Sequence, residues 1–158
     1  MKKYILIVDD EKDICLTLSK ILSSKGFSVI IASNSDAAIN EIKNTSIDLV
    51  LLDVWLEGSK KNGLELLKIM RNYNPDTPVI LISGHANIDI AVKAIKEGAF
   101  YFIEKPFKSE KLFLIINRAL ENAFLKKKYE IYKENLENDE EFIGSTVSIN
   151  NLKKKIHF

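Results

Sequence analysis

Three carboxylates, a hydroxyl and an ammonium group each stand at the end of a short apolar run in this sequence. They belong to Asp9 and Asp10, Asp53, Ser83 and Lys105. Two carboxylates ~4 Å apart repel each other by about 4 kcal/mol at an effective dielectric of 20, so a cluster of them needs a cation or raised pKa values. An all-oxygen site with open positions suits Mg²⁺. With a hydroxyl donor and a lysine beside it, such a site favours in-line phosphoryl transfer to an aspartate.

The apolar runs that precede these residues have the length of β-strands. They span residues 4–8, 27–32, 49–52, 79–82 and 100–103. The central runs are continuously apolar and rich in Ile and Val, which is typical of strands buried on both faces of a parallel sheet. In the strand order 2-1-3-4-5, ligands bind between the carboxyl ends of the first and third strands. We therefore expect the candidate side chains to converge in one crevice.

The segments between the runs carry apolar residues at helical spacing and predict five helices. These helices are expected after Asp10 and up to Gly26, over 35–43, after Gly63 and before Pro75, up to Gly98, and from near Ser109. Strand and helix thus alternate five times. This alternation predicts an α/β fold, a doubly wound (βα)5 arrangement of the flavodoxin-like type with a five-stranded parallel sheet.

The fifth helical pattern continues beyond the length that a compact domain needs. It passes through Phe124 into residues 126–138 without Gly or Pro. The apolar residues Ile131, Tyr132 and Leu136 support either a weakly specified coiled coil or a solvated, charged helix. We expect a domain at 1–122, a helical linker at 123–140, and a tail at 141–158 that is too short to bury a core.

The composition excludes several classes of protein. The 158 residues include 23 Lys and Arg and 22 Asp and Glu, so a globally basic nucleic-acid binder is not expected. Cys15 is the sole cysteine, and no apolar run approaches the ~20 residues of a membrane span. The N-terminus is no signal peptide, because its short apolar stretch runs directly into Asp9. A cytoplasmic protein without membrane or direct nucleic-acid contact is expected.

Four short motifs together resemble a known family. They are Val8-Asp9-Asp10-Glu11, Leu52-Asp53, Ile82-Ser83-Gly84 and Lys105-Pro106-Phe107. In this order and spacing they resemble the receiver domain of two-component response regulators, over about residues 2–122. The resemblance implies the CheY-like form of the fold and a phosphoacceptor signalling domain, which is not an enzyme. Its partner would be a sensor histidine kinase, and a homodimer would be expected.

The resemblance also implies metal ligands and an acceptor. Asp53 would accept the phosphoryl group, and Asp10 and Asp53 would bind Mg²⁺ directly. The backbone carbonyl of Trp55 would be a third direct ligand, and Asp9 would bind the ion through water.

Three further residues have implied roles around the acceptor. Ser83 would be the switch hydroxyl that turns toward the phosphoryl group, with Phe102 as its aromatic partner. Lys105 would contact the phosphoryl oxygens, and its peptide bond to Pro106 would be cis. Phosphorylation would then change the face made by the fourth helix, fifth strand and fifth helix.

Residues 53–67 and 83–107 resemble more narrowly the NtrX branch of the NtrC-type regulators, which activate the sigma-54 polymerase. The loop after Asp53 departs from the common pattern, because it lacks a Met-Pro pair and its Gly63 stands two residues later, which leaves the loop's conformation open. Residues 141–146 resemble the start of the ATPase domain of that branch, yet no phosphate-binding G-x-x-x-x-G-K-[ST] motif occurs. The chain is then a fragment of a longer transcription regulator, or else a stand-alone receiver or phosphate sink that acts by protein–protein interaction.

Several single residues admit a second interpretation. A phosphohydrolase is disfavoured because Asp53-Val-Trp55 lacks a second acid two residues on. His85 has no second His or Cys nearby and is expected to be a loop histidine. Cys15 is expected to be a small buried apolar residue. Trp55 either guards the crevice or covers apolar surface, and residues 126–128 are an ordinary solvated helix face.

Overall fold

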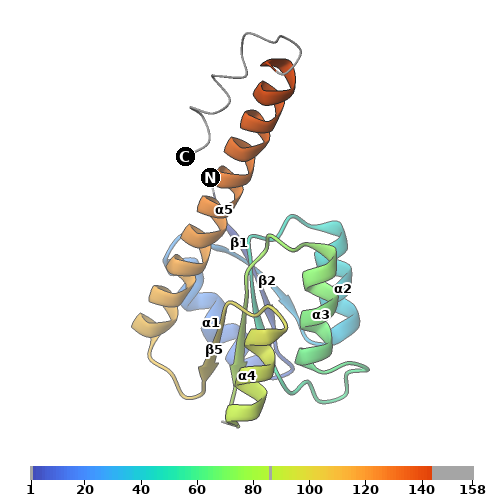
Figure 1. Cartoon of the computed structure of the whole chain (residues 1–158). Coiled ribbons are helices and arrows are strands. Elements are labelled where there is room, and N and C mark those ends of the chain that lie inside the picture. The colour runs from blue at the N-terminus through green and yellow to red at the C-terminus, as the bar shows by residue number, and fades with distance from the viewer. Residues whose placement is uncertain (1, 86, 144–158) are drawn as a thin grey trace. The chain divides into compact units, whose positions relative to one another are not determined.

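The computed structural model describes residues 2–85 and 87–143, with side chains up to residue 138, and contains five strands that alternate with five helices (Figure 1). The strands are β1 (Tyr4–Val8), β2 (Ser28–Ala32), β3 (Leu49–Asp53), β4 (Val79–Ser83) and β5 (Tyr101–Glu104). The helices are α1 (Lys12–Ser24), α2 (Ser35–Asn44), α3 (Gly63–Tyr73), α4 (Ile88–Lys96) and α5 (Ser109–Ile143). The part of the expected tail from residue 144 onward lies outside the described residues.

All strand pairs are parallel, in the order β2-β1-β3-β4-β5, which confirms the predicted α/β fold and sheet. The central strands β3 and β4 are buried along their whole length, and β1 is buried from Ile5 to Val8. The two edge strands retain exposed apolar residues, Ile31 in β2 and Tyr101 in β5. Burial along the strand thus marks the strands that have a neighbour on each side.

Helices cover both faces of the sheet because successive strand residues point to opposite faces. In β1, Leu6 and Val8 pack into a core with residues of α2, α3 and α4, whereas Ile5 and Ile7 pack with residues of α1 and α5. Figure 1 shows α2 and α3 on the side of the sheet opposite α1 and α5. The carboxyl ends of the strands therefore remain open for a site.

Helix starts and strand ends place the site residues. Asparagine side chains cap α2, α3 and α4, and Asn62 forms a capping box with Glu65 at α3. The positive φ angles of Gly26 and Gly98 allow the turns that end α1 and α4. Asp53 was expected just after its strand but is instead the last residue of β3, so its side-chain direction follows the pleat.

The chain divides into two compact units, Met1–Ala123 and Phe124–Phe158, and α5 is continuous over both. Within the first unit, α5 buries one face through Leu112, Ile116 and Ala119. The extended C-terminal helix that the sequence predicts is confirmed. None of the described helices is long and apolar enough to cross a membrane.

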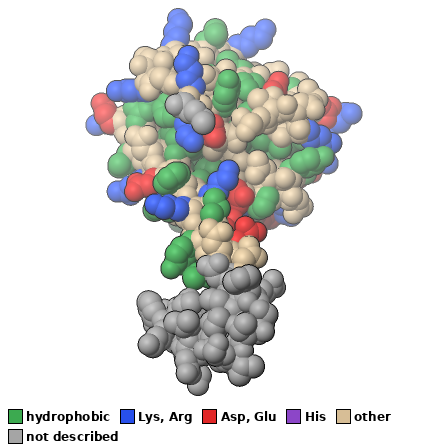
Figure 2. All heavy atoms as spheres, turned by 90° about the horizontal axis from the view of Figure 1, so that it is seen from above, with side chains coloured by type: hydrophobic (Ala, Val, Ile, Leu, Met, Phe, Trp, Pro, Cys, Tyr) green, Lys and Arg blue, Asp and Glu red, His purple; other side chains and the backbone are tan. Residues whose placement is uncertain are grey.

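Charge on the surface is mixed. On the face shown in Figure 2, Lys and Arg side chains lie scattered and interspersed with Asp and Glu, and they do not merge into one basic patch. This distribution agrees with the net charge of +1.

Candidate functional site

The three predicted carboxylates come together at the carboxyl ends of β1 and β3. These strands are neighbours, and their pairing sets Val8 beside Leu52, so the residues that follow lie side by side. One carboxylate oxygen from each of Asp9, Asp10 and Asp53 lies within 4.8 Å of the others. Asp9 and Asp53 are buried and Asp10 is half-buried. The acidic cluster that the sequence predicts is therefore present.

Asp9 is held by contacts with three parts of the chain. Its backbone N–H donates to the Ala32 carbonyl of β2 at 3.2 Å. Its Oδ1 accepts from the Glu11 N–H at 2.9 Å, an Asx turn that the Asp-x-Glu spacing could have suggested. Its Oδ2 lies 3.1 Å from the Lys105 ammonium. Both oxygens of Asp9 are thus engaged, which suits a residue that orients the site.

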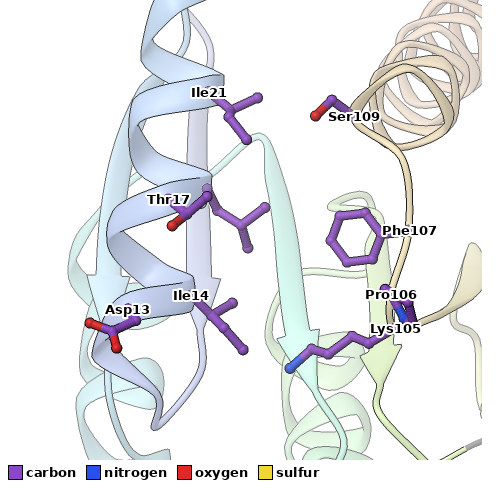
Figure 3. A pocket seen from close by; sticks show the side chains of 9 residues that line it. Asp13, Ile14, Thr17, Ile21, Lys105, Pro106, Phe107 and Ser109 are labelled. Carbon is purple, nitrogen blue, oxygen red and sulfur yellow. The ribbon is translucent and has the colours of Figure 1, made fainter.

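Lys105 follows the edge strand β5, and its side chain brings a positive charge to the cluster. Its backbone N–H donates to the Ser83 carbonyl at 2.7 Å, which continues the β4–β5 pairing by one residue. Its ammonium lies 3.8 Å from Asp53 Oδ1 in addition to its contact with Asp9. Figure 3 shows the side chain reaching across the strand ends toward α1. The Lys105–Pro106 peptide bond is cis, as the resemblance implied.

The cluster raises the pKa of Asp53 to about 6. Burial is the main cause and the Asp9 charge the next; the Lys105 ammonium opposes them, and the backbone N–H of Trp55 also lowers the pKa. Fully ionised, three carboxylates and one ammonium leave two negative charges uncompensated. A divalent cation with oxygen ligands balances that charge, so the donor set fits Mg²⁺.

Ser83 ends β4, the strand beside β3, and Phe102 lies in β5; among the described residues neither side chain forms a hydrogen bond to the cluster. The buried Ser83 hydroxyl donates to the His85 carbonyl and accepts from the His85 N–H, both at 3.1 Å. Phe102 is half-buried, pairs with Leu81 across the sheet and packs against the core that α2, α3 and α4 cover. The switch roles implied for both residues therefore remain predictions. His85 lies in a loop, as predicted.

The sequence left the conformation of the loop after Asp53 open. In the structure, a backbone hydrogen bond joins the two ends of this loop. The Gly63 N–H donates to the Val54 carbonyl at 2.8 Å. A side chain at Gly63 would collide with the Asp53 carbonyl oxygen and come within 2.7 Å of the Val54 Cα, so this position needs glycine. Leu56 is buried in the core, whereas the Trp55 side chain is 46% exposed. Trp55 is thus a surface residue, and its exposure leaves both interpretations of its ring open.

Cys15 lies behind the cluster. It is buried, as predicted, and its thiol donates to the Asp9 carbonyl at 3.4 Å. Burial, reinforced by the neighbouring carboxylates, raises the pKa of the thiol to about 11. The thiol therefore stays protonated at neutral pH and acts in packing. Sequence reasoning missed this contact because nothing in the spacing of Asp9 and Cys15 signals it.

A groove of about 490 Å³ lies beside Lys105, between α1 and the segment that joins β5 to α5 (Figure 3). Ile14, Leu18 and Ile21 line it on α1, with Phe107 opposite, and Asp13 and Thr17 add polar groups. No sequence pattern signals this groove, because its two walls lie about ninety residues apart in the chain. The groove thus places apolar surface next to Lys105, which contacts the acidic cluster.

Comparisons with known proteins agree with this geometry. The family model described as "Response regulator receiver domain" matches residues 5–117. The nitrogen assimilation regulatory protein NtrX of Azorhizobium caulinodans is 46% identical over 134 residues, which cover 85% of this chain and 30% of that protein. The crystal structure of the NtrX receiver domain from Brucella abortus matches with a TM-score of 0.71 and 48% identity, over 74% of this chain and 98% of that one.

A beryllofluoride-activated NtrC4 receiver domain, solved as a dimer, matches with a TM-score of 0.72 and 38% identity, over 76% of this chain and 98% of that one. The chain spans about 30% of the length of the first curated relatives that it matches. With the family model covering most of the chain, the fold and the comparisons agree: the chain belongs to the response regulator receiver domain family and is similar to the receiver domains of NtrX-type regulators.

Proposed function

We propose that this chain accepts a phosphoryl group on Asp53 from the phosphohistidine of a sensor histidine kinase. The observation that carries this proposal is the buried Asp53 carboxylate, which ends β3 in an acidic cluster and has the Lys105 ammonium 3.8 Å away. Membership of the receiver family supports the same reaction class. The chain acts as a phosphoacceptor signalling domain that promotes its own phosphorylation.

In the transfer, an ionised oxygen of Asp53 attacks phosphorus, an O–P bond forms and the N–P bond to the donor histidine breaks. The pKa of about 6 leaves Asp53 mostly ionised at neutral pH and therefore nucleophilic. Lys105 neutralises charge on the phosphoryl oxygens. Asp10, Asp53 and the Trp55 carbonyl would hold Mg²⁺ directly and Asp9 through water, and the bound ion supplies further positive charge to the phosphoryl group.

The groove beside Lys105 supports a protein donor over a small phosphoester. Its apolar lining, Ile14, Ile21 and Phe107 among others, adjoins the ammonium that faces Asp53. A partner that contacts this surface would present its phosphohistidine near the acceptor.

The output of phosphorylation is a changed surface. To reach the phosphoryl group, the Ser83 hydroxyl has to leave its two hydrogen bonds with His85. Phe102, half-buried against the α4 side of the core, moves with it and alters the face formed by α4, β5 and α5. Val92, Ile95 and Tyr101 on that face are more than 40% exposed, which supports a homodimer formed there.

Dimer affinity with and without a phosphoryl mimic tests this output. Sedimentation of the wild type should show tighter association with beryllofluoride and Mg²⁺, and Asp53→Asn should show no change. Equal affinity of the wild type in both conditions contradicts the dimer.

The chain acts within a longer, cytoplasmic NtrX-like regulator that controls transcription through output domains. Residues 1–122 form the receiver, and 123–140 form a helical linker to those domains. The compact unit Met1–Ala123 and the continuous helix α5 support this division. The relatives' greater length supports output domains, and contact with DNA would belong to them.

Intact mass after incubation with acetyl phosphate tests the acceptor. With Mg²⁺ the wild type should gain one phosphoryl adduct, and without Mg²⁺ it should gain little. Asp53→Asn should gain none, whereas Asp76→Asn, a change at an exposed aspartate before β4, should behave as the wild type. An adduct that survives in Asp53→Asn would place the acceptor elsewhere.

A further inference from the structure

The loop after Asp53 is fastened to the start of α2 by two serine hydroxyls that lie outside the site described above. The Ser35 N–H donates to the Ser59 Oγ at 3.2 Å, and the Lys61 N–H donates to the Ser35 Oγ at 3.3 Å. We call this reciprocal pair the Ser35–Ser59 clamp. Ser35 is 1% exposed, so its hydroxyl lies in the interior of the protein.

The clamp satisfies polar groups that would otherwise lack partners. Ser35 is the first residue of α2, and its N–H has no partner within the helix. The Asn34 side chain accepts a hydrogen bond from the Ala37 N–H and not from the Ser35 N–H. The Ser59 hydroxyl in the loop is the acceptor for the Ser35 N–H. An exposed ion pair between Lys60 and Asp36, at 3.7 Å, adds little. The hydroxyls therefore provide the main polar attachment of the loop to α2.

Attachment of the loop constrains the backbone of Trp55. Starting from Asp53, the chain is held at Leu56 by burial, at Ser59 and Lys61 by the clamp, and at Gly63 by its hydrogen bond to Val54. Trp55 lies inside this closed loop, two residues after Asp53. Displacing the loop from α2 would shift the Trp55 backbone relative to Asp53.

We propose that the Ser35–Ser59 clamp is a positioning element, which holds the Trp55 backbone against Asp53 and so sets the affinity of the acceptor site for Mg²⁺. This inference rests on the proposed function of Asp53 and deepens it. Neither serine touches the acceptor; both act through the path of the loop.

Two alanine variants with two controls test the clamp. Ser35→Ala and Ser59→Ala each remove one hydroxyl, and Ser59→Thr retains it at a half-buried position. Thr77→Val is matched in burial: the Thr77 hydroxyl donates to the Ile47 carbonyl at 3.2 Å, at the amino ends of the strands and away from the site. A merely structural role would make Thr77→Val and Ser35→Ala alike.

Two readouts on the full chain report the position of the loop. Trp55 is the sole tryptophan, so quenching of its fluorescence by acrylamide in metal-free buffer measures its accessibility. Mg²⁺ affinity is measured by isothermal titration calorimetry. We expect both alanine variants to raise quenching and to weaken Mg²⁺ binding roughly three- to tenfold, the range that the loss of one hydrogen bond gives. Ser59→Thr and Thr77→Val should match the wild type in both readouts.

The outcomes separate this inference from the proposed function. If the wild type binds Mg²⁺ and the folded Ser35→Ala and Ser59→Ala variants bind it equally well with unchanged quenching, the clamp has no positioning role. If the wild type does not bind Mg²⁺, the proposed metal-assisted function and this inference both fail. Because Ser59 is less buried than Ser35, Ser59→Ala decides the question should Ser35→Ala not fold.

Discussion

Lys105 and Asp9 form an ion pair at 3.1 Å, shorter than the 3.8 Å between Lys105 and Asp53, the proposed acceptor. The ammonium is thus held by Asp9 while remaining close to the carboxylate that we propose to react. All three side chains are at least four-fifths buried, so their charges are only partly screened by solvent.

Replacing Lys105 by methionine should destabilise the metal-free protein. The variant retains the apolar stem but leaves buried carboxylates without their ammonium, which costs about 1–3 kcal/mol of unfolding free energy. Lys60→Met removes a lysine from an exposed pair and should stay within about 0.5 kcal/mol of the wild type. Urea unfolding in EDTA at neutral pH measures both, and equal effects would show that the Lys105 pair contributes nothing specific.

Metal-free stability should fall as the pH rises from about 4 to about 6. The pKa of Asp53 is raised from 3.8 to about 6 on folding, so between these values the folded state binds more protons than the unfolded state. Protonation of Asp53 therefore contributes its full amount to the free energy of unfolding below about pH 4 and nothing above about pH 6. The total contribution is about 1–3 kcal/mol.

The pH dependence is best measured as a difference between variants. Urea unfolding of wild type and Asp53→Asn in EDTA, across pH 4 to 7, should show this slope in the wild type only. Asp76→Asn, at an exposed aspartate, should retain it. A slope that persists unchanged in Asp53→Asn would assign the effect to another group.

Asp10→Asn should stabilise the protein in metal-free buffer and remove most of its response to Mg²⁺. The change takes one charge out of a cluster whose carboxylate oxygens lie within 4.8 Å of one another, which favours folding by about 1 kcal/mol and raises Tm by a few degrees. Stabilisation by Mg²⁺ should largely disappear because binding to the folded state is lost.

Asp13→Asn, on the exposed first turn of α1, is the control for Asp10 and should keep the Mg²⁺ response. Thermal unfolding with and without Mg²⁺ compares the variants. A destabilised Asp10→Asn protein that still responds to Mg²⁺ would mean that Asp10 is not a ligand.

Gly63→Ala should be strongly destabilising. The new methyl group would meet backbone atoms of Asp53 and Val54, which cannot move aside as a side chain can, so we expect a loss of at least about 2 kcal/mol. Gly84→Ala, with nothing within 4 Å of the added atom, should lose less than about 1 kcal/mol. Chemical unfolding of both variants checks this, and similar losses would contradict the close approach at Gly63.

Sequence alone determined the sheet and the convergence of the acidic residues. Buried parallel strands have to be apolar throughout, so β1, β3 and β4 stand out, and their carboxyl ends have to meet at one edge. Asp9, Asp10 and Asp53 are therefore predictable neighbours. The asparagine caps of α2, α3 and α4 follow equally from local preference.

Only the tertiary structure decided which partners the side chains around Asp53 and its loop contact. The hydroxyl of Ser83 bonds His85, Lys105 lies closer to Asp9 than to Asp53, and Ser35 holds a loop 24 residues further along the chain. These arrangements depend on rotamers and on the path of an irregular loop. Such contacts join residues remote in sequence and leave no periodic pattern, because packing and hydrogen-bond geometry in the folded protein, and not local preference, select them.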